Sequence, residues 1–483
     1  MPKETLKKLS IFALLLFFTI SAFYIRLENF KKSEYRSIDE VVYYRMAKQM
    51  RDNFFDYNTI PYGLELAKRG RDLPKYFFEP LFKHPPVYTI LASCSVKAFG
   101  NSMEASLCPS LLLGVLLIPL VFLIGNTVYG LGVGLLAAFF MWLDPITTIC
   151  SQKVWMDTTI AFLNTLTVLF FVIGLKKNNG LAFILSGVSS GLAFNTKYSG
   201  VLITFIITAF CLFYARELFK NKAFLFSLVL PVIMLIPWLL WNYSVYGIDC
   251  LILNDEARSL INLFPPKLIS LIIIVTLLIL LCVSILRRLS FSRNSAQTPP
   301  PSSTTAAGVS SSKDNLLSIS SLIFVVGFLM LLLGEPISKG FNFFKFPVHS
   351  WASGVISDGN PLFYFGQMIE FSPFFILGIV MILLFHKEET KEMSFIRLAA
   401  TIIIIFFIAW GNFQSRYILP ALPLFIILSS SLYASIFNLC EKIDFFIIRA
   451  LLRGILFAFL ILTVVKILII NFLLSFPNNC CYF

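Results

Sequence analysis

Apolar runs of roughly 17–25 residues, the length that crosses a bilayer as a helix, alternate with short polar connections along this chain. Inside a bilayer every backbone polar group needs a partner in the protein, so such runs indicate helices. The pattern predicts an all-α polytopic membrane protein with about thirteen spans. We place them at 9–25, 109–126, 129–148, 158–175, 181–196, 199–215, 223–243, 267–286, 317–334, 372–386, 396–411, 418–437 and 454–475.

One connection differs from the others in composition. Residues 288–316 contain three consecutive prolines and several runs of serine and threonine, which bury too little apolar surface to fold. We predict a disordered cytoplasmic linker here. It separates an N-terminal transmembrane catalytic module (1–287, with an outer loop at 26–107) from a C-terminal transmembrane module (317–483, with an outer loop at 335–371).

Composition and charge fit this class of protein. Hydrophobic residues make up 58% of the 483 residues and charged residues 13%, against about 25% charged residues in soluble domains. The net charge of +13 comes largely from Lys and Arg clusters between apolar runs, where they are topology signals and not a nucleic-acid footprint. These clusters share one side if the N-terminus is cytoplasmic. We therefore expect function on the extracytoplasmic or luminal face.

An acidic pair, Asp39-Glu40, opens an amphipathic helical pattern in the first outer loop, with an apolar face over residues 42–50. We expect this loop to carry interfacial amphipathic helices, with this one lying on the membrane surface. Two interpretations stay open. Ser37 as N-cap with Glu40 three positions later forms a capping box, and Asp39 favours the helix dipole. Alternatively, a carboxylate at the membrane interface can meet a lipid headgroup and take a proton from an acceptor.

Four more polar positions interrupt apolar sequence near predicted outer ends. Lys83-His84 precedes two prolines and a helix expected near Tyr88, where either side chain could bind phosphate or simply be solvated. Asp157 opens the fourth span, as a helix terminus or a site residue. Lys197 marks a tight outward turn or a paired charge. Arg416 suits a phosphate or snorkelling to the interface.

Taken in order, these segments resemble glycosyltransferase family 39, the lipid-phosphate-sugar dependent group that includes protein O-mannosyltransferases and the lipid A aminoarabinose transferase. The matching segments are Asp39-Glu40 with Tyr43-Tyr44, Lys83-His84-Pro85-Pro86, Asp157, Gly191 to Lys197, Pro237-Trp238 with Asn242-Tyr243, and Arg416 to Pro420. The similarity covers the first 250 residues best. It departs at Trp241, where relatives often carry arginine, and with no large soluble domain after the last predicted span we expect the loops alone to recognise the acceptor.

The resemblance implies a GT-C fold and an inverting single displacement. A sugar would move from a dolichyl- or undecaprenyl-type phosphate carrier in the bilayer to a protein, lipid or glycan acceptor. The implied catalytic residues are Asp39, Glu40 and Asp157, the donor phosphate-binding residues are Lys83, His84 and Arg416, and the pocket residues are Tyr43, Tyr44, Tyr88, Lys197 and Tyr364.

Two other function classes remain. A transporter or flippase of lipid-linked substrates would predict inverted repeats and charges at the bilayer midplane, and a membrane scaffold would use its outer loop to bind a partner. Neither accounts for acids and bases recurring at outer ends. Three histidines and unpaired cysteine spacing indicate no metal motif, although the sequence leaves the cofactor unknown, a divalent metal included.

Overall fold

The computed structural model describes residues 3–33, 36–247, 363–384, 390–410 and 414–474. Within these ranges the chain forms α-helices, short 3₁₀ helices and turns, and no strand occurs. The all-α class predicted from the apolar runs is confirmed.

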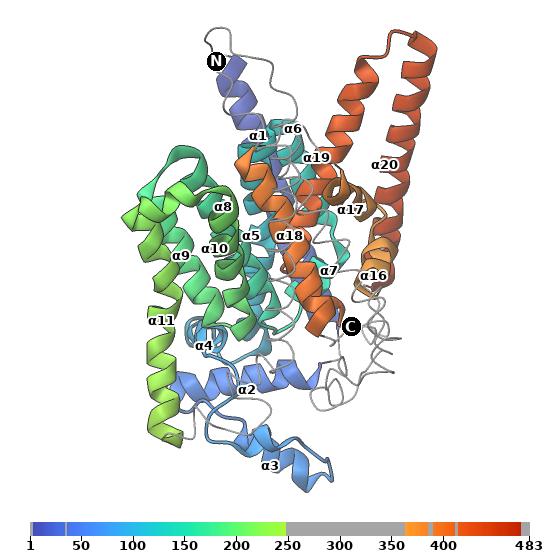
Figure 1. Cartoon of the computed structure of the whole chain (residues 1–483). Coiled ribbons are helices and arrows are strands. Elements are labelled where there is room, and N and C mark those ends of the chain that lie inside the picture. Colours follow the sequence, from blue (N-terminus) through green and yellow to red (C-terminus); the bar gives the residue numbers. More distant parts are fainter. Residues whose placement is uncertain (1–2, 34–35, 248–362, 385–389, 411–413, 475–483) are drawn as a thin grey trace, which may run out of the picture.

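Most of the helices run roughly parallel or antiparallel to one another in a bundle (Figure 1). The N-terminal part contributes α1 (Lys3–Lys32), α5 (Met103–Tyr129), α6 (Leu131–Leu143), α7 (Pro145–Ser151), α8 (Asp157–Lys177), α9 (Gly180–Phe194), α10 (Leu202–Tyr214) and α11 (Lys222–Tyr246). The C-terminal part contributes α16 (Phe363–Phe371), α17 (Phe375–Leu383), α18 (Lys391–Trp410), α19 (Leu422–Glu441) and α20 (Phe446–Leu474). Single 3₁₀ turns stand at η1 (Lys75–Phe78), η2 (Tyr198–Val201), η3 (Arg216–Lys220) and η5 (Ser415–Ile418).

Six of the described helices are long and apolar enough to cross a membrane, or seven if α6 and α7, bent by 55° at Asp144, count as one broken span. α17 has nine residues, fewer than the roughly 20 that a span needs. The predicted spans 267–286 and 317–334, like the linker 288–316, lie outside the described residues. The count of thirteen therefore stays a prediction.

The two predicted modules share one hydrophobic core. The Phe140 ring on α6 stacks on Phe374, just before α17, with centroids 3.8 Å apart, and Phe171 on α8 meets Phe395 on α18 at 4.5 Å. α19 is apolar all round and is buried along its first half, as expected of a central helix. The linker therefore separates two modules along the sequence, but the described helices of both modules pack into one core.

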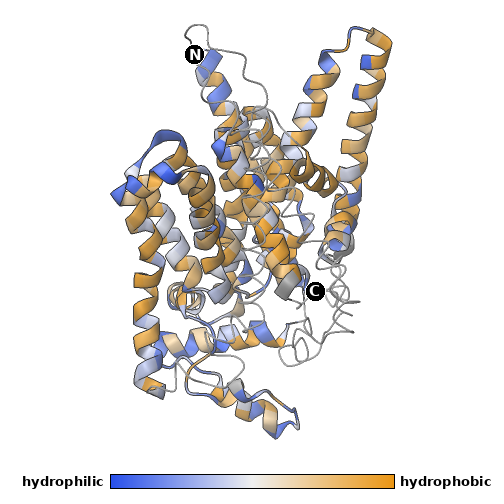
Figure 2. Cartoon of the chain, in the orientation of Figure 1, coloured by the Kyte–Doolittle hydropathy of each residue, from blue (hydrophilic) through white to orange (hydrophobic). Residues whose placement is uncertain are grey.

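The first outer loop folds across one end of this bundle. α2 (Ile38–Asp52) crosses that end, α3 (Ile60–Lys68) lies beyond it, and α4 (Val87–Phe99) lies between α2 and the bundle (Figure 1). Figure 2 shows apolar residues dominating the bundle, whereas α2 and α3 carry many hydrophilic ones. The apolar face predicted for α2 is buried, and it packs on α4, so protein and not lipid covers it.

A buried charge marks the contact between α1 and the α6–α7 bend. Arg26 is 1% exposed and Asp144, which caps α7 by accepting from the Thr147 N–H at 2.6 Å, is 2% exposed. Asp144 is the main opposite charge acting on Arg26. The two side chains form no direct ion pair, because Arg26 Nη1 and Nη2 and Asp144 Oδ1 have no hydrogen-bond partner in the described part of the chain. Replacing Arg26 still removes the opposite charge that acts on the buried Asp144 carboxylate.

We expect Arg26→Met to destabilise the folded protein, because the buried Asp144 carboxylate then loses the opposite charge that acts on it. The measurement is the midpoint of thermal aggregation of the detergent-solubilised protein, followed by size exclusion. Lys31→Met on the same helix, which breaks an exposed pair with Glu28, is the control and should change little. An equal shift in both variants would contradict the assignment.

Candidate active site

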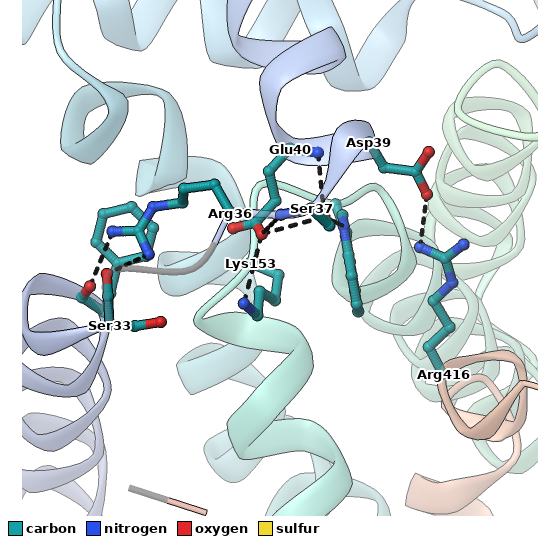
Figure 3. A network of polar contacts seen from close by, with 9 residues as sticks. Ser33, Arg36, Ser37, Asp39, Glu40, Lys153 and Arg416 are labelled. Carbon is teal, nitrogen blue, oxygen red and sulfur yellow. Dashed lines mark hydrogen bonds and ion pairs between the residues drawn. The ribbon is translucent and has the colours of Figure 1, made fainter. Parts of the chain in front are cut away.

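Asp39 and Arg416 meet across the end of the bundle. Arg416 Nη1 donates to Asp39 Oδ2 at 3.0 Å, joining α2 to η5 over a sequence separation of 377 residues (Figure 3). The guanidinium also lies 4.5 Å from the Trp155 ring centroid and donates through Nε to Gln414. The Arg416 side chain is 16% exposed but that of Asp39 is 50% exposed. The carboxylate is therefore held in place and still accessible.

A second ion pair stands beside the first. Lys197 Nζ lies 3.5 Å from Asp157 Oδ1, at the start of α8, and 4.5 Å from the Tyr417 ring centroid. Lys197 sits in the turn between α9 and η2. That turn is tight because Gly200 packs on the end of α9, where an added Cβ would lie 2.3 Å from Ala193 backbone atoms. Lys197 therefore has both of the predicted features, since it lies in a tight turn and is paired with an acidic residue.

Lys83 and His84 reach the same region with different charge states. Burial, together with Lys197 and Arg416 and against the attraction of Asp39, lowers the pKa of Lys83 to about 8. Burial and the cations Lys83, Lys197 and Arg416 hold the pKa of His84 well below its usual value. At neutral pH Lys83 is a cation and His84 is a neutral imidazole, so of the two Lys83 supplies charge for a phosphate.

Tyr43 supplies a buried phenol next to the carboxylates. Its ring packs edge-on against Phe82 and Tyr88, with centroids 5.8 and 5.2 Å away. Burial, with the charges of Asp39 and Asp157, raises the pKa of Tyr43 well above its usual value. The phenol stays protonated and is available as a hydrogen-bond donor at the site.

Glu40 points the other way from Asp39, although the two are neighbours in the chain (Figure 3). Glu40 is fully buried and completes the capping box predicted from Ser37, whose Oγ accepts from the Glu40 N–H. Its Oε2 also forms an ion pair with Lys153 at 3.4 Å. The geometry favours the structural interpretation of Glu40, and we assign it no contact with substrate.

Comparison with known proteins finds similarity to one family model and to several solved structures. Residues 83–241 match the family model described as dolichyl-phosphate-mannose-protein mannosyltransferase. The fold is similar to ArnT from Cupriavidus metallidurans in the apo state (TM-score 0.53, 13% identity, 98% of this chain and 78% of ArnT covered). The chain therefore has a GT-C fold, and part of it matches the mannosyltransferase family model.

Two further solved structures share the fold of this chain. One is the oligosaccharyltransferase AglB from Archaeoglobus fulgidus, in complex with an inhibitory peptide and a dolichol-phosphate (TM-score 0.58, 17% identity, 99% of this chain but 56% of AglB covered). The other is ArnT bound to undecaprenyl phosphate (TM-score 0.50, 14% identity, 96% and 72% covered). No curated protein matches the sequence significantly.

Three of the predicted pocket tyrosines are held by contacts of their own. Tyr44 donates to the Asn101 carbonyl at 3.2 Å, on the side of the α4–α5 turn. Tyr88, 1% exposed, is hydrogen-bonded to Ser110 Oγ at 2.9 Å in the core. Tyr364 is fully buried on α16 next to Tyr417. Their contacts are those of packing residues, and a pocket role for them stays a prediction.

Lys153 and Trp155 are the site residues that our sequence analysis did not single out. Lys153 is 5% exposed and Trp155 4% exposed, in the segment between α7 and α8. A signal was available, because Lys153 is the one basic residue between Gly130 and Lys176, and a lysine in such apolar sequence needs a partner. Among the described residues no group of three or more His, Cys, Asp or Glu could hold a metal ion.

The depressed pKa of Lys83 predicts how donor use depends on pH. Below pH about 8 the ammonium is present and can bind an anion, and above it the charge is lost. We therefore expect kcat/KM for the lipid donor, which reports the free enzyme, to fall as pH rises through this value. Lys83→Arg should move that limb to higher pH, because arginine stays charged. An unmoved limb would assign it to another group.

Proposed function

We propose that this protein is a glycosyltransferase that moves a sugar from a polyprenyl phosphate carrier to an acceptor hydroxyl or amine by one inverting displacement. The observation that carries the proposal is the half-exposed Asp39 carboxylate held by Arg416 beside two further cations. Asp39 takes the acceptor proton as the new bond forms at the anomeric carbon. The bond to the phosphate oxygen breaks, and Lys83, Lys197 and Arg416 stabilise the departing phosphate.

The charge balance of the site supports a monophosphate carrier. Among the described residues, Lys83, Lys197 and Arg416 face the carboxylates of Asp39 and Asp157, which leaves one positive charge in excess. A sugar linked through a single phosphate carries one negative charge and neutralises that excess. A diphosphate carrier brings a second negative charge that these residues leave unpaired. The dolichol-phosphate in AglB and the undecaprenyl phosphate in ArnT are carriers of the monophosphate kind.

The extracytoplasmic or luminal side is the proposed location of the reaction. The basic connections gather at the end of the bundle opposite α2 (Figure 1). At that end Lys391, the first residue of α18, forms an ion pair with Glu217 in the α10–α11 connection. Asn221 of the same connection donates to Asn178 in the α8–α9 connection. Short basic connections favour the cytoplasmic side. This arrangement supports a cytoplasmic N-terminus and an outer-facing Asp39. Protein, lipid and glycan acceptors all remain within the proposal.

The test is transfer by the purified protein in lipid nanodiscs. These are given a polyprenyl-phosphate-linked radiolabelled sugar, the diphosphate-linked analogue or a nucleotide sugar, with membrane extract as the acceptor source. We expect label on an acceptor from the monophosphate donor only. Nanodiscs enclose no compartment, so a flippase gives no product there. Label that stays on the carrier under all conditions, while it crosses the bilayer of sealed vesicles, would support the transporter alternative.

A further inference from the structure

Glu40 and Lys153 form a buried ion pair that no part of the proposed chemistry uses. Glu40 Oε2 accepts from the Ser37 N–H at 2.9 Å, from Ser37 Oγ at 3.1 Å and from Lys153 Nζ at 3.4 Å (Figure 3). The side chains are 0% exposed for Glu40 and 7% for Lys153. A capping box needs only the contacts between Ser37 and Glu40, so it does not explain the buried ion pair with Lys153.

Glu40 belongs to a closed ring of contacts around the site, and Lys153 holds it from outside that ring. Ser37 Oγ, held by Glu40, accepts from Trp155 Nε1 at 3.2 Å. The Arg416 guanidinium lies over the Trp155 ring, 4.5 Å from the ring centroid. Arg416 in turn donates to Asp39, which precedes Glu40 in the chain. Each contact in this ring restrains a residue that also makes the next contact.

The ring connects three segments that are far apart in sequence. Lys153, Trp155 and Asp157 lie close together in the stretch that enters α8, and the Trp155 N–H donates to the Lys153 carbonyl at 2.8 Å. An anchor at Lys153 therefore restrains this short stretch. The α2 N-terminus supplies the carboxylate of Asp39, and η5 supplies Arg416. Fixing Lys153 to Glu40 therefore fixes Asp157 and the Trp155 platform relative to Asp39.

Energetics argue against a role in stability alone. Burying two charges is costly, and apolar residues of similar volume often give an equally stable core. An ion pair is instead directional, because each member restricts where the other can lie. With burial this complete, neither Glu40 nor Lys153 touches a substrate at the open side of Asp39.

We propose that the Glu40–Lys153 pair is a positioning device, which sets Asp39, and through Ser37 and Trp155 also Arg416, in the geometry that transfer requires. The inference rests on the proposed function. Glu40 and Lys153 act through Asp39 and Arg416 and do not themselves react. Disturbing the pair should thus slow the chemical step more than it weakens donor binding, which Lys83 and Lys197 also support.

The test compares four variants in the nanodisc assay. Glu40→Gln keeps the capping contacts but removes the carboxylate charge beside Lys153, and Lys153→Met removes the ammonium charge beside Glu40. The double variant removes both charges, and Lys153→Arg keeps the pair. We expect each charge-unbalancing single variant to lower kcat per folded molecule by about 10²-fold, since displacements near 1 Å cost that much, with a smaller rise in donor KM. The double variant should recover much of the loss, and Lys153→Arg should stay close to the parent.

Controls separate this inference from general damage and from the proposed function. Glu65→Gln breaks the partly exposed Arg45–Glu65 pair in the same loop and should leave kcat unchanged. The inference is overturned by full kcat in both single variants, by a double variant no better than the worse single one, or by a folded but inactive Lys153→Arg protein. If a single variant fails to fold, the double variant and Lys153→Arg still decide the matter. Transfer at the parent rate by a folded Asp39→Asn variant instead overturns the proposed function.

Discussion

Asp39→Asn should lower kcat for sugar transfer by about 10²–10⁴-fold, the range that a positioned general base contributes. Asparagine has nearly the same shape and can still accept a hydrogen bond from Arg416, so the end of the bundle keeps its geometry. It cannot take the acceptor proton. Donor KM should not rise, because the three cations around the phosphate remain and one competing carboxylate is gone. Single-turnover transfer with saturating lipid donor is the measurement.

The matched control is Asp52→Asn on the same helix. Asp52 lies at the exposed C-terminal end of α2, paired with Arg51, and its side chain is 66% exposed. The same chemical change there should leave transfer unaltered. If Asp39→Asn folds normally and transfers sugar at the parent rate, Asp39 is not the base and the proposed mechanism fails.

Arg416→Met should lower kcat/KM for the lipid donor by about 10²–10³-fold, as expected when one preorganised donor to a developing negative charge is removed. Methionine keeps an apolar stem but loses the guanidinium that lies over the Trp155 ring, so the departing phosphate loses one of its three cations. Unlike Asp39→Asn, this change should raise donor KM as well as lower kcat. Arg416→Lys should recover part of the loss, since lysine keeps the charge without the planar fork.

The control for this prediction is Arg453→Met on α20. Arg453 pairs with Glu441 and is 36% exposed, and it lies on the α19–α20 hairpin, apart from the Asp39 region (Figure 1). The measurement is steady-state kinetics over a range of donor concentrations, which gives kcat and donor KM for both arginine variants. A normal donor KM in Arg416→Met would mean that Lys83 and Lys197 hold the phosphate without help from Arg416.

The sequence by itself determined the features that local periodicity and chemistry specify. Apolar runs predicted the helices, because backbone groups in a bilayer must pair within the helix. Ser37 with Glu40 predicted the capping box, and the spacing of residues 42–50 predicted the buried face of α2, because both depend on neighbours within a turn or two. Lys83, Asp157, Lys197 and Arg416 were singled out because charge next to apolar sequence is costly without a reason.

Only the tertiary structure decided which of these residues meet. Arg416 reaches Asp39 across 377 positions, and Glu40 turns to Lys153 while its neighbour faces the open side. Tyr88 and Tyr43 are equally aromatic in sequence, yet one hydrogen-bonds into the core and the other stands by the carboxylates. The physical reason is that the rotation of each helix about its axis follows from packing against distant helices, and a local pattern carries no information about those partners.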